Sequence, residues 1–304
     1  MQTAMPNFPP AGIWPVLYAF FDAHNRLDRE AMRLQVDHVI DAGAPGIVIL
    51  GLATEVRRLS AEEKHQLIDW ASSDIDKRVP LAVTLNGDTP EAQIELADHA
   101  LDRGAQSFIL QPPNVQEQAE TWYFDFFSEV MRRLDAPCGI QNAPEYLGVG
   151  LSTGALVQLA AQQPNFLWLK GEGSALTIGA TIETLRAHDS PMPVFNGRGG
   201  LELVDNLRAG CAGLIVAPDT FDKQTRIYDA FMRGDVDHAQ IAYRDILPAI
   251  VFVMQSLESL TCYGKRIAAW RMGFDVAHDR GSLPSAFGLA CAQRVVAGLG
   301  QFAV

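Results

Sequence analysis

The clearest candidate for a reacting side chain is Lys170, which ends a short apolar run at residues 166–169. Gly171 and Gly173 follow it, so the lysine lies where a strand of buried residues stops. An amine held there is partly removed from water, which lowers its pKa, and a neutral amine condenses with a carbonyl group to form an imine. Lys170 is therefore the candidate for covalent catalysis on a carbonyl substrate. A lysine that simply turns toward water is the alternative.

A second candidate is the loop at residues 51–55, Gly-Leu-Ala-Thr-Glu, which follows an apolar run at residues 46–50. Ser60 and Glu63 form a capping box, which predicts that a helix begins directly after the loop. Backbone N–H groups in such a loop can bind an anion, for example the carboxylate next to a reacting ketone. An ordinary connecting loop with a packed glycine explains the same residues, so both readings stay open.

Other catalytic chemistries lack their residues. The seven histidines and four cysteines show no CxxC, HxH or HExxH spacing, so we expect no metal site. Neither a histidine nor a pair of carboxylates falls at the predicted strand ends, which argues against metal-assisted hydrolysis and against a two-carboxylate glycosidase. The remaining lysines have polar or charged sequence neighbours: Lys64, Lys77, Lys223 and Lys265. Imine chemistry at Lys170 therefore has the strongest support.

A repeated unit of strand and helix positions these residues. Eight apolar runs have strand length, and a helical pattern follows each of them. They cover residues 12–20, 46–50, 80–84, 107–110, 137–141, 167–170, 193–196 and 213–216. Strands that alternate with helices form a parallel sheet, and eight of them favour an α/β fold of the (β/α)8 TIM-barrel type, with a doubly wound open sheet as the alternative. Reacting groups in such barrels lie at the carboxyl ends of the strands.

The barrel accounts for residues 1–234, and residues 235–304 are helical in pattern. Helices are expected there over residues 239–260, 264–272 and 284–299. We expect this C-terminal extension to pack on the barrel, as a lid or as an oligomer surface, so that the whole chain forms one structural domain.

Composition limits the class of protein. The chain has 304 residues, of which 48% are hydrophobic and 20% charged, and a formal net charge of −12. This acidity argues against nucleic-acid binding and against a polybasic membrane contact. Four scattered cysteines suggest reduced thiols, and the sequence shows neither a signal-like N-terminus nor a run of about 18 apolar residues. We therefore predict a cytoplasmic protein that acts on a small molecule.

Several short motifs follow one another in a definite order. They are Gly12, Gly51-x-x-x-Glu55, Leu59-Ser60-x-Glu62-Glu63, Pro112-Pro113, Asn142-x-Pro144, Lys170-Gly171, Gly197 and Ala209-Gly210-x-x-Gly213. This order resembles the dihydrodipicolinate synthase and N-acetylneuraminate lyase superfamily over residues 12–299. The resemblance implies a (β/α)8 barrel with C-terminal helices, usually a homotetramer, that acts on 2-keto acids with no metal or organic cofactor. By position, Lys170 would form the imine, and Leu52, Ala53 and Thr54 would hold the keto-acid carboxylate.

Departures from the family pattern bear on the reaction. Members usually carry Gly-Thr-Thr-Gly-Glu in the loop, where this chain has Leu52, Ala53 and Thr54. Members also usually place a proton-shuttling tyrosine directly before the Asn-x-Pro motif, where this chain has Gln141. Glutamine orients partners by hydrogen bonds but is no general base near neutral pH. The synthase usually has an arginine a few residues on, and residues 145–147 here contain none. The pattern is closest to the family's 2-keto-3-deoxy sugar-acid dehydratase and aldolase branches.

The resemblance and these residues together predict a Schiff-base lyase that dehydrates a 2-keto-3-deoxy sugar acid. Lys170 would form the imine, and Thr54, Gln141 and bound water are the candidates to move protons. Retro-aldol cleavage to pyruvate and an aldehyde, synthase-like condensation, and a non-catalytic keto-acid-binding protein are the alternatives. The residues expected to contact substrate are Leu52, Ala53, Asn142, Gly197, Arg198 and Ala217.

Arg198 follows the seventh predicted strand and lies among glycines. A guanidinium binds a carboxylate or phosphate bidentately, so Arg198 predicts a short substrate whose far end is anionic or strongly polar. Pairing with Glu202, one turn along the next helix, is the alternative. We expect a homotetramer with Tyr123 among its contact residues, and no nucleic-acid or membrane partner.

Overall fold

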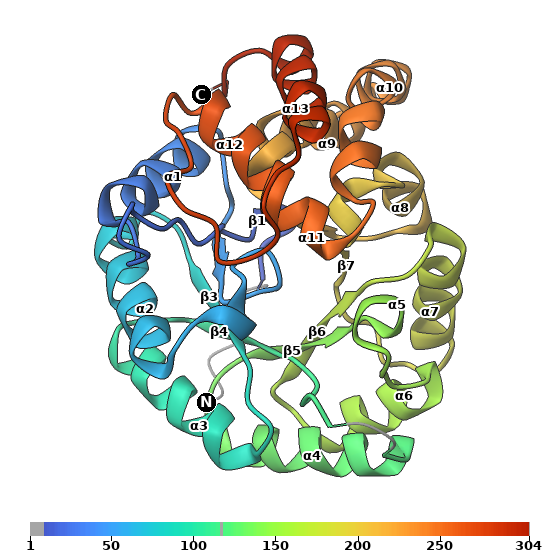
Figure 1. Cartoon of the computed structure of the whole chain (residues 1–304). Helices are drawn as coiled ribbons and strands as arrows, with labels where there is room; N and C mark the ends of the chain where they lie inside the picture. Colours follow the sequence, from blue (N-terminus) through green and yellow to red (C-terminus); the bar gives the residue numbers. More distant parts are fainter. Residues whose placement is uncertain (1–8, 116–117, 304) are drawn as a thin grey trace.

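The structure is a computed structural model that describes residues 9–115 and 118–303. Parallel strands form a ring at its centre, and helices surround this ring (Figure 1). The eight strands pair in the order β1-β8-β7-β6-β5-β4-β3-β2. One further parallel bridge, between Val16 and Val48, joins the two ends of this order. The chain is therefore a (β/α)8 barrel, which confirms the predicted fold class. The alternative, an open doubly wound sheet, is wrong.

The strands are short and almost completely buried. Helices cover the outer faces of the strands, and packed side chains fill the inside of the barrel. Because both faces are buried, the strand sequences are continuous apolar runs. Their bounds are β1 (Gly12–Pro15), β2 (Ile47–Ile49), β3 (Leu81–Leu85), β4 (Ser107–Leu110), β5 (Cys138–Asn142), β6 (Phe166–Gly171), β7 (Val194–Asn196) and β8 (Gly213–Val216).

Side-chain caps begin several of the barrel helices where the sequence predicts them. Ser60 and Glu63 form the capping box of α2, and the side chains of Asp28, Thr89 and Ser152 cap α1, α3 and α6. The helices are α1 (Arg29–Asp41), α2 (Ala61–Ile75), α3 (Pro90–Asp102), α4 (Glu120–Arg133), α5 (Pro144–Leu147), α6 (Thr153–Gln162), α7 (Ala175–Ala187), α8 (Leu203–Ala209) and α9 (Phe221–Met232).

Some bounds differ from the sequence prediction. The first strand was expected to run to Phe20 but ends at Pro15, and only the next two N–H groups still donate to neighbouring strands, Val16 to Val216 and Leu17 to Val48. The sequence also predicts a helix from about residue 117 to residue 134; its expected start lies outside the described residues, and α4 begins at Glu120. The single helix expected over residues 239–260 ends earlier, and a short helix and a π-helical turn follow it.

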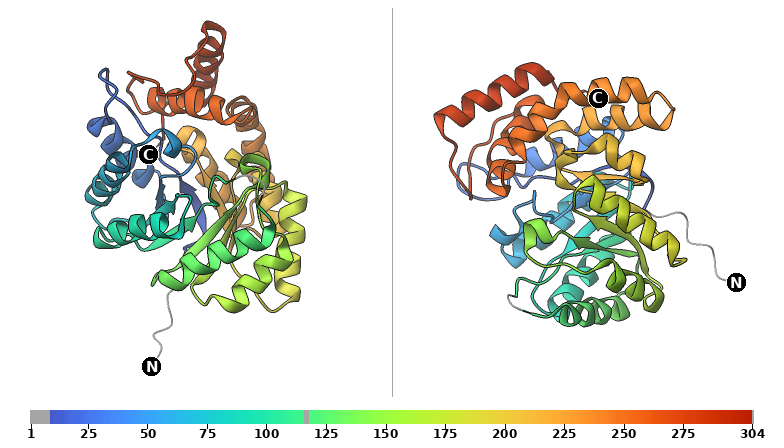
Figure 2. Two further views of the ribbon diagram at one scale, coloured as in Figure 1. Left: turned by 60° about the horizontal axis from the view of Figure 1, so that its bottom comes forward. Right: turned by 90° about the vertical axis from the view of Figure 1, so that its right-hand side faces the viewer.

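The C-terminal helices are α10 (Val236–Val253), α11 (Leu257–Ser259), α12 (Lys265–Arg271) and α13 (Ala286–Leu299). They lie together on one side of the barrel (Figure 2). Among the described residues no single helix is long and apolar enough to cross a bilayer, although α10 with residues 257–271 passes on length and composition as a pair bent by 105°. Arg271 in α12 forms a buried ion pair with Asp222 in α9 at 2.7 Å. Such a pair orients the extension on the barrel, because separating its partners would strand a buried charge.

Lys265 departs from the sequence prediction. Its side chain is 1% exposed, it forms an ion pair with Glu55, and its Nζ lies 5.2 Å from the centre of the Phe21 ring. Burial lowers the pKa of Lys265, although Glu55 opposes this effect. The described chain thus has a second buried lysine besides Lys170, which its charged sequence neighbours did not indicate.

Tyr123 also differs from its predicted role as a subunit contact. It lies in α4, only 3% of it is exposed, and its hydroxyl donates a hydrogen bond to the Val115 carbonyl at 2.8 Å. Its aromatic neighbour Trp122 is 36% exposed. Tyr123 is therefore part of the core of one chain, because its ring is already covered by its own fold.

Candidate active site

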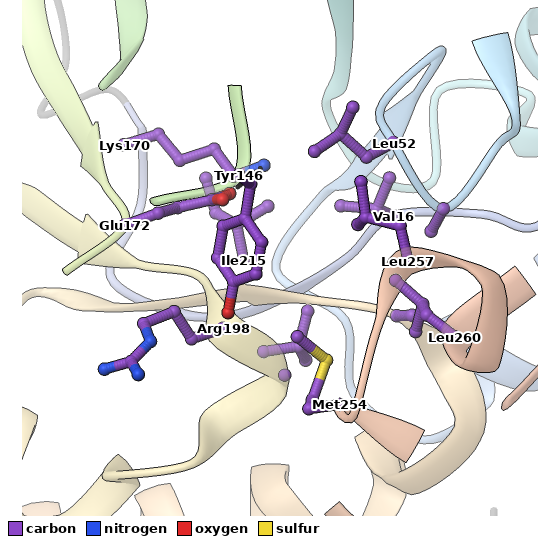
Figure 3. Close-up of a pocket in the computed structure, with 14 residues that line it drawn as sticks. Val16, Leu52, Tyr146, Lys170, Glu172, Arg198, Ile215, Met254, Leu257 and Leu260 are labelled. Atoms are coloured by element: carbon purple, nitrogen blue, oxygen red, sulfur yellow. Dashed lines mark ion pairs between the residues drawn. The ribbon is translucent and has the colours of Figure 1, made fainter. Parts of the chain in front are cut away.

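A cavity of about 50 Å³ lies where strands β1, β6 and β8 end, beneath the turn between α10 and α12 (Figure 3). Its lining comes from seven separate parts of the chain. The lining residues are Val16, Leu52, Ala53, Tyr146, Lys170, Glu172, Arg198, Gly199, Ile215, Val216, Ala217, Met254, Leu257 and Leu260. The polar side chains among them are those of Tyr146, Lys170, Glu172 and Arg198.

Lys170 lies near the end of β6, and only 4% of it is exposed. Residues two apart on a strand face the same side, so Lys170 and Glu172 both project into the cavity. Lys170 Nζ lies 2.8 Å from Glu172 Oε1. The lysine predicted to form an imine is therefore buried in the cavity, with its amine against a carboxylate.

Two further hydrogen bonds hold Glu172 in position, and a third holds its partner Gln141. Its Oε1 accepts from Gln141 Nε2 at 3.1 Å, and Gln141 Oε1 accepts from Gln111 Nε2 at 3.0 Å. Its backbone N–H donates to the Asn142 carbonyl at 2.8 Å. Hydrogen bonds to an ionised group are stronger than those between neutral groups, so this chain orients the carboxylate beside Lys170. Gln141 thus acts on Glu172 and is not itself part of the cavity lining.

Gly197 leaves the space that Glu172 occupies. A Cβ atom at position 197 would lie 2.6–2.7 Å from three atoms of the Glu172 side chain. Non-bonded atoms do not approach a Cβ atom this closely in folded proteins, so any larger residue at position 197 would displace the Glu172 carboxylate. Gly197, which was predicted to contact substrate, is not among the residues that line the cavity and lies against the Glu172 side chain.

Arg198 lines the cavity but already has two carboxylate partners. Its Nη1 lies 2.9 Å from Glu202 Oε2, and its Nε lies 3.4 Å from Glu145 Oε2. Burial disfavours its charge, yet the hydrogen bond with Tyr146 and the two carboxylates outweigh burial and raise the pKa of Arg198. The pairing with Glu202 that the sequence left as the alternative is therefore present.

Two residues predicted to act in the site lie outside its lining. The Asn142 amide accepts from the Leu151 N–H at 2.8 Å and donates to the Leu151 carbonyl at 2.9 Å. The Thr54 hydroxyl is fully buried and donates to the Leu17 carbonyl at 2.7 Å. Both side chains secure loops around the cavity, and neither presents its polar group to it in this structure.

The loop at residues 51–55 reaches the cavity through Leu52 and Ala53. The Thr54 and Glu55 N–H groups donate within the loop, to Gly51 and Leu52. Leu52 and Ala53 are therefore the loop residues that a molecule bound in the cavity would meet. Ala217, after β8, also lines the cavity.

Sequence reasoning missed Glu172, Tyr146 and the residues of the C-terminal turn. Glu172 follows Lys170 by two positions, and the alternation of a strand would have placed both on one face. Tyr146 lies in residues 145–147, where the sequence pattern indicates only that the arginine of the synthase is missing. Burial raises the pKa of Tyr146, so its phenol stays protonated at neutral pH. Among the described residues, no three or more histidine, cysteine, aspartate or glutamate side chains are grouped to hold a metal ion.

Residues 9–277 match the model of the Dihydrodipicolinate synthetase family. The probable 2-dehydro-3-deoxy-D-pentonate aldolase YjhH of Escherichia coli is 26% identical over 258 residues, which cover 83% of this chain and 85% of YjhH. The putative 2-dehydro-3-deoxy-D-gluconate aldolase YagE of the same organism is 27% identical, with 78% of this chain and 79% of YagE covered.

Two solved structures share the fold. A putative dihydrodipicolinate synthetase from Pseudomonas aeruginosa superimposes with a TM-score of 0.88 at 21% identity, covering 95% of this chain and 99% of that one. YagE, solved in complex with pyruvate, superimposes with a TM-score of 0.86 at 22% identity, covering 95% and 98% of the two chains. At this identity the structures establish the barrel with its C-terminal helices.

Proposed function

The chain belongs to the dihydrodipicolinate synthetase family and is a lyase of that family, and we propose that it acts on a 2-keto acid through an imine formed by Lys170. The observation that carries this proposal is the Lys170 amine, buried in the cavity and 2.8 Å from the Glu172 carboxylate. The described lining of the cavity contains no other lysine. A buried amine beside a proton acceptor can become neutral and attack a carbonyl carbon.

Imine formation uses both residues. Glu172 accepts a proton from the Lys170 ammonium, and the neutral amine adds to C2 of the keto acid. The C2 oxygen then takes up two protons, one from the attacking nitrogen and the one that Glu172 holds, and leaves as water, which gives the protonated imine and restores the Glu172 carboxylate. Leu52 and Ala53 hold the adjacent carboxylate. The protonated imine withdraws electrons from C3 and makes the C3 protons acidic, which is the purpose of covalent catalysis here.

Dehydration of a 2-keto-3-deoxy acid follows from that intermediate. Glu172 accepts a proton from C3, and the resulting enamine expels the C4 hydroxyl, which takes a proton and leaves as water. Hydrolysis of the imine then frees the product and Lys170, so the net change is the loss of one water. Glu172 takes the place of the missing tyrosine as the proton carrier, and Gln141 orients it.

Aldol cleavage is the second candidate, favoured by the names of YjhH and YagE. In that reaction a base takes the proton of the C4 hydroxyl, the C3–C4 bond breaks, and an aldehyde leaves. The remaining enamine is protonated at C3 and hydrolysed to pyruvate. Synthase-like condensation has no specific support in this cavity. We do not propose the non-catalytic keto-acid-binding protein, because the chain is a lyase of its family.

The products distinguish the two reactions. Incubation with 2-keto-3-deoxy acids, followed by quantification of substrate and pyruvate, should show substrate loss without pyruvate if the enzyme is a dehydratase. Aldol cleavage would release one pyruvate for each substrate consumed. The Lys170→Ala variant is the control and should be inactive in both cases. Turnover that survives in this variant would contradict the mechanism.

We also propose that the chain assembles as a homotetramer in the cytoplasm, as the family resemblance and composition predict. Exposed apolar side chains on the C-terminal helices and just before α13 support an interface there: Ile241, Val251, Leu283 and Phe287 are at least half exposed. Light scattering should give a mass of four times the 33.2 kDa of one chain. A mass of a single chain at micromolar concentration would contradict the assembly.

A further inference from the structure

The polar side chains of the cavity gather on one side, and most of their polar atoms already have partners. Lys170 and Glu172 pair with each other, and Tyr146 lies between them and Arg198, with its hydroxyl toward Arg198 (Figure 3). Arg198 Nη1 donates to Glu202, whereas its Nε lies 3.4 Å from Glu145 Oε2 and makes no hydrogen bond. Once Lys170 has reacted, the described lining therefore offers few free donors or acceptors to a polyhydroxylated chain.

The opposite side of the cavity is an apolar wall, which we define as Val16, Met254, Leu257 and Leu260. Val16 follows β1, and the other three residues belong to the C-terminal turn. A hydroxyl placed against such a wall loses its water without gaining a partner, which is costly. Each methylene group of a ligand that is buried there should increase the affinity of that ligand about fourfold.

We propose that the substrate carries an apolar group beyond C4, an alkyl or aryl substituent, instead of the polyol of a sugar acid. The inference rests on the proposed function, since it requires a keto acid bound as an imine at Lys170. From that anchor, the carbon chain extends along the apolar wall, because the route toward Arg198 is occupied by Tyr146. The expected substrate is therefore a 4-hydroxy-2-keto acid with an apolar tail, in place of the sugar acid that the sequence predicts.

Two six-carbon acids test this directly. 4-Hydroxy-2-oxohexanoate and 2-keto-3-deoxygluconate have the same length and differ in hydroxyls at C5 and C6. The readout is the concentration of each acid that gives half-maximal fixation on Lys170 by borohydride, which requires imine formation but no turnover. We expect half-saturation at a concentration at least about tenfold lower for the hexanoate, since two methylene-sized groups are buried at about fourfold each. Equal values, or tighter binding of the sugar acid, would overturn the proposal.

A pair of variants locates the effect. Leu257→Asn places an amide in the apolar wall and should reduce the preference for the hexanoate by at least about fivefold. Leu176→Asn makes the same change at a position that is 88% exposed and outside the cavity, and should leave the preference unchanged. A preference that survives Leu257→Asn would contradict the role of the wall. Fixation of pyruvate on Lys170 reports separately on the proposed function: its absence in the natural chain would contradict that function and not only the substrate class.

Discussion

Lys170 and Lys265 are both buried, and each has a glutamate partner, yet only Lys170 lines the cavity. Glu55 and the Phe21 ring enclose the Lys265 amine. Glu172, by contrast, lies in the cavity with Lys170. Burial alone therefore does not identify a reacting lysine; access of a substrate to the amine does.

Replacing Glu172 by glutamine keeps the size of the side chain but removes its ability to accept a proton. If Glu172 moves the C3 proton, the methyl protons of pyruvate should exchange with deuterium at least about 100-fold more slowly in Glu172→Gln, as expected for loss of a general base. Borohydride should still fix pyruvate on Lys170. Proton NMR in heavy water measures the exchange. Partial recovery in Glu172→Asp is the matched control, and exchange at the natural rate in Glu172→Gln would exclude Glu172 as the base.

The strand that carries Lys170 could be predicted because its signal is local: an apolar run that is followed by glycines. The eight repeated units made the barrel predictable for the same reason. The partners of the site residues could not be predicted in this way. Asn142 is engaged by the backbone of Leu151 across a loop, and Leu257 reaches the cavity from a turn far along the chain. Such contacts depend on how elements pack, which no local pattern records.

The turn after β7 makes a testable contribution through Gly197. Gly197→Ala should displace Glu172, because the added Cβ would lie 2.6–2.7 Å from its side chain. We expect pyruvate deuterium exchange to fall at least about tenfold and the free energy of unfolding to fall by about 1–3 kcal/mol, the usual cost of overpacking. Exchange kinetics and urea denaturation measure these effects. Gly298→Ala in α13, where a Cβ meets nothing within 4 Å, is the control. Normal exchange in Gly197→Ala would show that Glu172 does not depend on this glycine.

The stability of the whole barrel should depend on pH through Asp219, which follows β8 and accepts a hydrogen bond from the Tyr18 hydroxyl at 2.8 Å. Burial raises the pKa of Asp219 from 3.8 to about 6, although Tyr18, Thr220 and Arg271 act in the opposite direction. Between these two values the folded chain binds more protons than the unfolded chain. The contribution of Asp219 to the free energy of unfolding therefore falls as pH rises from about 4 to about 6.

Comparison with Asp219→Asn isolates this contribution, because the other titrating groups are common to both chains. From pH 4 to pH 7, the natural chain should lose up to about 3 kcal/mol of unfolding free energy relative to the variant. Urea denaturation at the two pH values measures this difference. A difference that does not change with pH would show that Asp219 titrates alike in the folded and unfolded chains.

Imine formation between Lys170 and a 2-keto acid can be trapped by borohydride reduction. The protein is treated with borohydride and pyruvate, digested, and its peptides are mapped by mass spectrometry. We predict the mass of a reduced pyruvate adduct on Lys170, absent without pyruvate and absent in Lys170→Ala. No adduct on any peptide, or an adduct on Lys265 in place of Lys170, would contradict the account.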